Sequence, residues 1–200
     1  MKLPEAIKSL ADQLSELPSI GPRQAMRLAF YLVSRGPNEI RGLSEAVRGL
    51  EEVKICSSCF FIHQNQNSLC DICKNPARRR DVIMVVEKET DLISVENTGK
   101  FMGRYLILGP IPKTGVFEDW QKLRIQNLKS ILEKEPGSKA EEIILGFNPT
   151  SFGDFHASIL SKELAPFAKK ISRLGRGLPT GGEIEFADDE TLGGALESRK

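Results

Sequence analysis

The chain has 200 residues, of which 40% are hydrophobic and 28% charged, and its formal net charge is +1. This length and hydrophobic content can bury one substantial core with smaller modules beside it. The charge excludes a globally basic nucleic-acid-binding protein, so any affinity for phosphate must come from local clusters.

Neither a membrane span nor a secretion signal is found in the sequence. No apolar run approaches the roughly 18 to 20 residues that a spanning helix needs. The chain opens with Met1–Glu5 and no cleavable apolar leader follows. We therefore expect a soluble, cytoplasmic protein.

The first 50 residues have the apolar spacing of three short helices. Apolar residues recur at three- and four-residue steps over residues 3–17, which predicts an amphipathic helix ended by Pro18. A second helix is predicted over residues 22–34, and Gly36 and Pro37 separate it from a third. The apolar positions of the third helix are Ile40, Leu43, Val47 and Leu50.

The turn between the first two helices resembles the helix-hairpin-helix motif of DNA-binding proteins over residues 17–32. Gly21 can adopt a positive φ in this turn, and the free N–H groups at the start of the following helix can bind a phosphate without reading bases. Arg23 and Arg27 are four residues apart and leave the same helix face. Gly21, Arg23 and Arg27 are therefore the candidate DNA contacts, and an ordinary helical bundle with a solvated arginine face is the alternative.

All four cysteines of the chain fall into two C-x-x-C pairs, Cys56 with Cys59 and Cys70 with Cys73. Two such pairs separated by a short polar loop can supply the four sulfur ligands of a structural zinc ion. Two disulfides are the alternative, but they would require an oxidising compartment. We therefore predict one structural zinc ion per chain.

Residues 78–174 show strands alternating with helices, which indicates an α/β domain with a parallel sheet. Strands are predicted over residues 82–87, 105–108 and 143–147, and helices over 90–97, 118–134 and 153–174. The ligand-facing edge of such a sheet lies at the carboxyl ends of its strands, where Glu87 and residues 148–150 fall.

This stretch resembles a Toprim domain, the fold shared by type IA and II topoisomerases, primases and some nucleases. Catalytic members hold a divalent cation with a strand-end glutamate and a D-x-D pair. Glu87 fits the glutamate, but Phe152 stands in place of the first aspartate and only Asp154 remains. Glu87 and Asp154 are therefore expected to form a weak divalent-ion or partner site, or to be structural, and no catalytic residue is assigned.

The order of these parts resembles the RecR family of bacterial recombination mediators over nearly the full chain. The hairpin, the cysteine quartet, residues 146–150 and the tail over 191–197 carry the likeness. It implies a non-enzymatic DNA repair protein that assembles into a ring-like tetramer. It further implies action with RecO, and in some settings RecF, to load RecA onto single-stranded DNA.

We accordingly predict an α/β multidomain protein with four parts. These are a helix-hairpin-helix DNA-binding region (1–53), a C4 zinc finger (54–77), a Toprim-like domain (78–174) and a C-terminal assembly segment (175–200). Association with the nucleoid during repair is expected. A Toprim metal-dependent nuclease or primase, and a zinc-stapled scaffold that does not touch DNA, are the competing functions.

Overall fold

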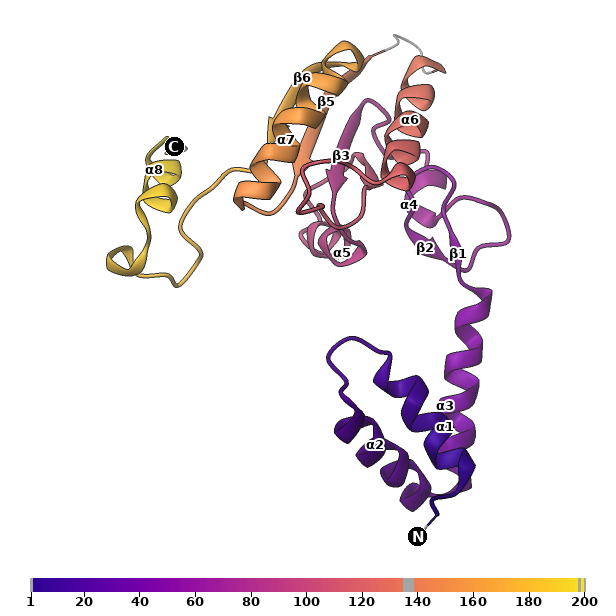
Figure 1. The fold of residues 1–200 in the computed structure, drawn as a ribbon. Coiled ribbons are helices and arrows are strands. Elements are labelled where there is room, and N and C mark those ends of the chain that lie inside the picture. Colours follow the sequence, from indigo (N-terminus) through magenta and orange to yellow (C-terminus); the bar gives the residue numbers. More distant parts are fainter. Residues whose placement is uncertain (1, 135–138, 198, 200) are drawn as a thin grey trace. The chain divides into compact units, whose positions relative to one another are not determined.

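The structure is a computed structural model, and it describes residues 2–134, 139–197 and 199 (Figure 1). The chain divides into two compact units, Met1–Val53 and Lys54–Lys200. Within the described residues, no helix is long and apolar enough to cross a bilayer.

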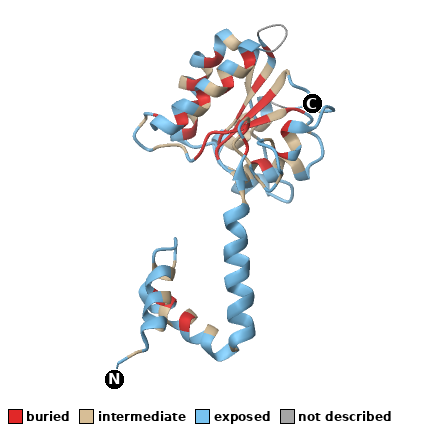
Figure 2. Ribbon diagram, turned by 90° about the vertical axis from the view of Figure 1, so that its right-hand side faces the viewer, coloured by how far each residue is buried: buried red, intermediate tan, exposed pale blue. Residues whose placement is uncertain are grey.

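The first unit consists of three helices and a short 3-10 turn. Helices α1 (Glu5–Ser15), α2 (Pro22–Arg35) and α3 (Pro37–Gly49) confirm the prediction from apolar spacing, and η1 (Leu50–Glu52) follows α3. Gly36, with φ of +88°, ends α2 and precedes α3. Figure 2 shows α3 exposed along its length, since none of its residues is buried. A small core joins α1 to α2 through Ala11, Ala25 and Ala29.

The turn between α1 and α2 has its positive φ at Ser19 and not at Gly21. Gly21 has φ of −83° and ψ of 166°, which any residue can adopt, whereas Ser19 has φ of +67°. Gly21 therefore does not use the positive φ that a glycine allows. The chain reverses at Ser19, so that Gly21 is already extended when it precedes the helix and leaves Pro22 at the first helical position.

The second unit begins with the cysteine module. Strands β1 (Lys54–Ile55) and β2 (Ile62–His63) form an antiparallel pair, and α4 (Asp71–Lys74) follows the connecting loop. The four-stranded sheet comes next along the chain. Its order is β4-β3-β5-β6, and every neighbouring pair is parallel.

The sheet strands are β3 (Val82–Val86), β4 (Arg104–Ile107), β5 (Ala140–Gly146) and β6 (Ala168–Arg173). The helices predicted over residues 90–97 and 118–134 are present as α5 (Glu89–Asn97) and α6 (Asp119–Lys134), and α7 (Ser151–Leu164) follows β5. The α/β class and the parallel sheet are therefore confirmed.

The single helix predicted over residues 153–174 is wrong. Helix α7 ends at Leu164, the 3-10 turn η2 (Ala165–Phe167) follows, and β6 then pairs with β5. Pro166 lacks an amide hydrogen and cannot continue the helix. Lys169 and Lys170 are exposed on β6, so this edge strand lacks the continuous apolar run that marks the inner strands.

Alternate residues of β3 point to opposite faces of the sheet, and each face has its own core. Ile83 and Val85 belong to the larger core, which α6 and α7 cover. Met84 and Val86 belong to the second core, to which α5 contributes Leu92. The four cysteines lie in this second core, so the cysteine module packs directly on the sheet.

Beyond the sheet, the chain has little regular structure until its last helix. A 3-10 turn, η3 (Ile184–Phe186), precedes α8 (Asp189–Glu197). Neither element contains a buried residue. Ile184 and Phe186 keep 68% and 80% of their surface exposed, which leaves a strongly apolar turn in solvent.

Candidate metal centre and nucleic-acid interface

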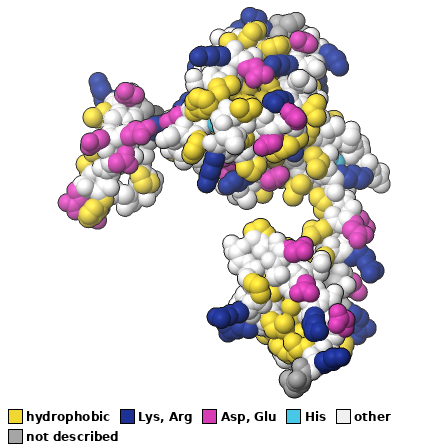
Figure 3. Space-filling model, viewed as in Figure 1, with side chains coloured by type: hydrophobic (Ala, Val, Ile, Leu, Met, Phe, Trp, Pro, Cys, Tyr) yellow, Lys and Arg dark blue, Asp and Glu magenta, His cyan; other side chains and the backbone are white. Residues whose placement is uncertain are grey.

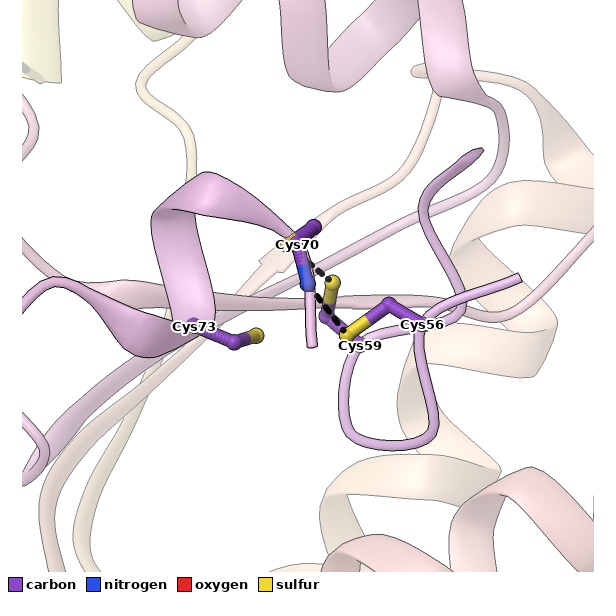
Figure 4. Close-up of side chains that lie close together, drawn as sticks. All are labelled: Cys56, Cys59, Cys70 and Cys73. Atoms are coloured by element: carbon purple, nitrogen blue, oxygen red, sulfur yellow. Dashed lines mark hydrogen bonds between the residues drawn. The ribbon is translucent and has the colours of Figure 1, made fainter. Parts of the chain in front are cut away.

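The four cysteine side chains converge on one point (Figure 4). Cys56 and Cys59 come from the turn after β1, whereas Cys70 precedes α4 and Cys73 lies within it. All four sulfur atoms lie within 4.8 Å of one another, and the Sγ atoms of Cys59 and Cys70 are 3.5 Å apart. The cysteines are free thiols, so the disulfide alternative has no support.

Backbone hydrogen bonds shape both halves of the centre. The amide of Phe60 donates to Cys56 O at 3.0 Å, and the amide of Lys74 donates to Cys70 O at 3.1 Å. The amide of Cys70 also donates to Cys56 Sγ at 3.4 Å. Hydrogen bonds with the Cys59, Cys70 and Cys73 thiols, in that order, lower the pKa of Cys56, against the effect of burial.

This arrangement fits a tetrahedral metal ion. Four thiolates at about 2.3 Å from zinc have sulfur atoms about 3.8 Å apart, close to the spacing seen here. All four residues are buried, with at most 7% of their surface exposed, so the centre has no open face for a substrate. The residues could therefore hold a metal ion in a closed, structural site consistent with zinc.

The predicted DNA contacts lie at the start of α2 in the helical unit. Gly21 is the N-cap and supplies no side-chain hydrogen bond, so the amides of Arg23 and Gln24 lack a capping acceptor. Arg23 and Arg27 are exposed. In the described part of the chain, no hydrogen bond or ion pair engages either guanidinium.

Glu87 lies at the end of β3, where the sequence placed it, and it is buried. Its Oε1 atom accepts hydrogen bonds from the backbone N of Asn148 at 2.9 Å and from Nδ2 of the same residue at 3.1 Å. The carboxylate therefore ties the ends of β3 and β5 together. Only 7% of the Glu87 surface is exposed.

Asp154, in the first turn of α7, is surrounded by arginines. Its Oδ1 atom lies 2.5 Å from Nη2 of Arg173 and 2.6 Å from Nη2 of Arg176. The hydrogen bond from Arg176, and then that from Arg173, lowers the pKa of Asp154 despite some burial. Sequence reasoning missed this cluster because its members are about 20 residues apart and follow no local pattern.

Arg176 extends the cluster to the last helix. It also forms an ion pair with Glu190 of α8. Arg173 and Arg176 thus join α7, β6 and α8.

Two family models match the chain at its ends. One describes the RecR helix-hairpin-helix and matches residues 7–50, and the other describes the RecR C-terminal region and matches residues 177–200. The "Recombination protein RecR" of Roseiflexus castenholzii is 42% identical over 202 aligned residues, covering 99% of this chain and 95% of the relative. The chain belongs to the RecR family.

Other RecR proteins match to a similar extent. The "Recombination protein RecR" of Frankia casuarinae is 40% identical and covers 97% of this chain and 96% of its own length. That of Dehalococcoides mccartyi is 39% identical, with coverages of 98% and 94%. These RecR relatives therefore span the helical unit, the cysteine module, the sheet and the C-terminal segment alike.

Proposed function

We propose that this RecR-family protein is a non-enzymatic recombination mediator in DNA repair that binds DNA through the start of α2. The observation that carries the proposal is the pairing of uncapped amides at Arg23 and Gln24 with two free guanidiniums, Arg23 and Arg27. Helix N-termini attract phosphate through such amides and through the helix dipole. These groups contact phosphates and not base edges. We therefore expect the protein to bind both single- and double-stranded DNA without sequence preference.

A ring-like homotetramer would turn these weak contacts into a clamp. Two arginines per subunit make few phosphate contacts, but several linked subunits bind with higher avidity. The apolar surface of the helical unit supports self-association (Figure 3). Its exposed residues on α2, on α3 and just after α3 include Phe30, Tyr31, Val33, Ile40, Leu43, Val47 and Leu50.

Family membership supports a proposal for the partners. Relatives of about 40% identity are named recombination proteins. We therefore propose action with RecO, and with RecF in some settings, to load RecA onto single-stranded DNA. A cytoplasmic protein associated with the nucleoid during repair fits this role.

We further propose that Cys56, Cys59, Cys70 and Cys73 hold one structural zinc ion per chain. When bound, zinc would supply a cross-link between two short loops and no reaction chemistry. The thiolates would be its four ligands. The cysteine module would then be fixed on the sheet face that it covers.

The surroundings of Glu87 and Asp154 favour a surface that binds a partner over a site for a divalent ion. Asp154 is neutralised by two arginines, and Glu87 is already engaged by Asn148. Phe152, where a further carboxylate would be needed, is 47% exposed and supplies no oxygen ligand. These features favour a mediator over a Toprim nuclease or primase.

The test is a titration of fluorescently labelled duplex and single-stranded DNA with full-length protein, across a series of salt concentrations. R23A/R27A should weaken binding about tenfold or more and reduce the salt slope by about one for each lost phosphate contact. R41A/R48A is the matched control, since it removes the same charge from α3. Equal losses in both variants would contradict the assignment to α2.

The same samples separate the competing functions. DNA recovered intact with and without Mg²⁺ supports the mediator. Cleavage that depends on Mg²⁺ would favour the Toprim enzyme. If the wild-type protein does not bind DNA at low salt, the result would favour the zinc-stapled scaffold that does not touch DNA.

A further inference from the structure

A row of contacts leads from the cysteine centre to a pocket at the strand ends. Cys59 O accepts a hydrogen bond from the amide of Ile107, at the end of β4, at 2.9 Å. The next residue, Phe60, has φ of +65°, which residues with side chains rarely adopt. The position of the Phe60 ring is therefore set by the turn that carries Cys56 and Cys59.

The Phe60 ring stacks against Arg124 of α6. The Arg124 Cζ atom lies 4.7 Å from the centroid of Phe60 and 4.8 Å from the centroid of Trp120, so the guanidinium is stacked between two aromatic rings. Its Nη1 atom donates to Ile107 O at 2.9 Å. Burial lowers the pKa of Arg124, and the negative charge of Glu89 opposes that shift.

Arg124 and Trp120 also line a pocket of about 430 Å³ at the carboxyl ends of β3 and β4. Trp120 is 43% exposed there. Gly109, with φ of +99°, packs against the indole so closely that an added Cβ would clash with it. The other residues that line the pocket are Glu87, Lys88, Glu89, Thr90, Ile107 and Pro110.

We propose that metal occupancy of the cysteine centre sets the shape of this pocket, with Phe60 and Arg124 as the positioning residues. The inference rests on the metal site proposed above and is independent of DNA binding. Without a metal, Cys56 and Cys59 lose the cross-link that holds their turn. Phe60 can then leave its left-handed conformation. Arg124 loses one of the two aromatic rings that hold its guanidinium, and Trp120 in turn loses the guanidinium that packs against its own ring.

Trp120 reports on this row of contacts, because it is the only tryptophan in the chain. Full-length protein is prepared with zinc, stripped with a thiol-reactive mercurial and chelator, and reloaded after reduction. Emission and acrylamide quenching of Trp120 are followed beside far-UV circular dichroism. Stripping should raise the quenching constant and shift the emission to longer wavelength, and zinc should reverse both changes.

Variants that keep their zinc decide the proposal even if stripping unfolds the domain. F60L and R124M are each measured after a colorimetric assay has shown full zinc content. Both should have a higher quenching constant for Trp120 than wild-type protein. F61L is the matched control: both rings pack against the second core, but of the two only Phe60 stacks on Arg124 among the described contacts.

The outcomes are distinct. A raised quenching constant in F60L and R124M, with F61L like wild type, supports the proposal. Wild-type quenching in zinc-loaded F60L and R124M, or an unchanged signal in stripped wild-type protein, overturns it. A chain that binds no zinc would contradict the metal site itself, which the zinc assay reports separately from the fluorescence.

Discussion

The guanidinium of Arg78 donates to both carboxylate oxygens of Glu96, which joins the chain just after the cysteine module to α5. Nη1 of Arg78 also donates to Phe101 O at 3.0 Å and to Gly103 O at 3.2 Å. The Tyr105 hydroxyl donates to the same carboxylate at 2.6 Å. One arginine thus satisfies acceptors from α5 and from the loop before β4.

Replacing this arginine should destabilise the second unit. Arg78→Ala removes the guanidinium from Glu96, which keeps only the Tyr105 hydroxyl, and from the carbonyls of Phe101 and Gly103. The side chains of Arg78 and Glu96 are only 11% and 24% exposed. We expect a loss of about 2 to 3 kcal/mol in the free energy of unfolding, below the value for fully buried pairs. Urea denaturation measures the loss.

Arg79→Ala is the control for this prediction. Arg79 pairs with Asp81, but both side chains are substantially exposed, at 58% and 43%. Its loss should cost little, because ion pairs between exposed side chains contribute little to stability. Equal destabilisation by the two variants would contradict the role assigned to Arg78.

Stability should depend on pH through Asp154. Its arginine partners lower its pKa in the folded protein below the ordinary value of about 3.9. The folded state therefore binds fewer protons there, and the ion pairs stabilise it fully only above about pH 4 to 5. That contribution is lost as the pH falls through the folded pKa.

Wild-type protein and Asp154→Asn are compared by urea denaturation between pH 7 and pH 3. The wild-type advantage should be constant near neutrality and should shrink below about pH 4. Acid release of metal affects both proteins and cancels in the difference. An advantage that does not change with pH would show that the Asp154 carboxylate contributes little to stability.

Much of this fold follows from local patterns in the sequence. The helices of the first unit were predictable because apolar residues recur at helical spacing and Pro22 and Pro37 mark helix starts. The inner strand β3 was predictable because it is a short apolar run buried on both faces. Strand β6 was not, because an edge strand with exposed lysines has no such run.

The contacts between distant residues could not be predicted in the same way. The cysteine spacing indicates a metal site, but it does not tell that the module covers one face of the sheet. Arg124 gives no local signal of its stacking on Phe60, 64 positions earlier in the numbering. The sequence pattern places Asp154 in an acidic site with Glu87, but in the structure its carboxylate pairs with Arg173 and Arg176.

Loss of one metal ligand should affect the sheet as well as the cysteine module. Cys59→Ser removes a buried sulfur from the second core, to which Met84, Val86 and Ile107 of the sheet also belong. We expect loss of zinc and a destabilisation of several kcal/mol. This should be less than the roughly 10 to 16 kcal/mol of zinc binding by finger peptides, because the packed sheet remains.

Hydrogen exchange locates the effect of Cys59→Ser. Amides of β3 and β4 should lose protection, whereas those of α1 and α2, in the other compact unit, should keep it. Wild-type protection of β3 and β4 in a variant shown to lack zinc would contradict the coupling of the module to the sheet.

Alanine substitutions at two glycines with positive φ distinguish the cost of backbone strain from the cost of a steric clash. Gly99, with φ of +64°, has no atom within 4 Å of an added Cβ, whereas Gly109, with φ of +99°, faces the Trp120 ring. Gly99→Ala should cost about 1 to 2 kcal/mol from strain alone. Gly109→Ala should cost about 1 to 3 kcal/mol more, because it also displaces the indole. Urea denaturation followed by circular dichroism gives both values. Trp120 emission should change only in Gly109→Ala, and an unchanged emission there would mean that the glycine serves backbone conformation alone.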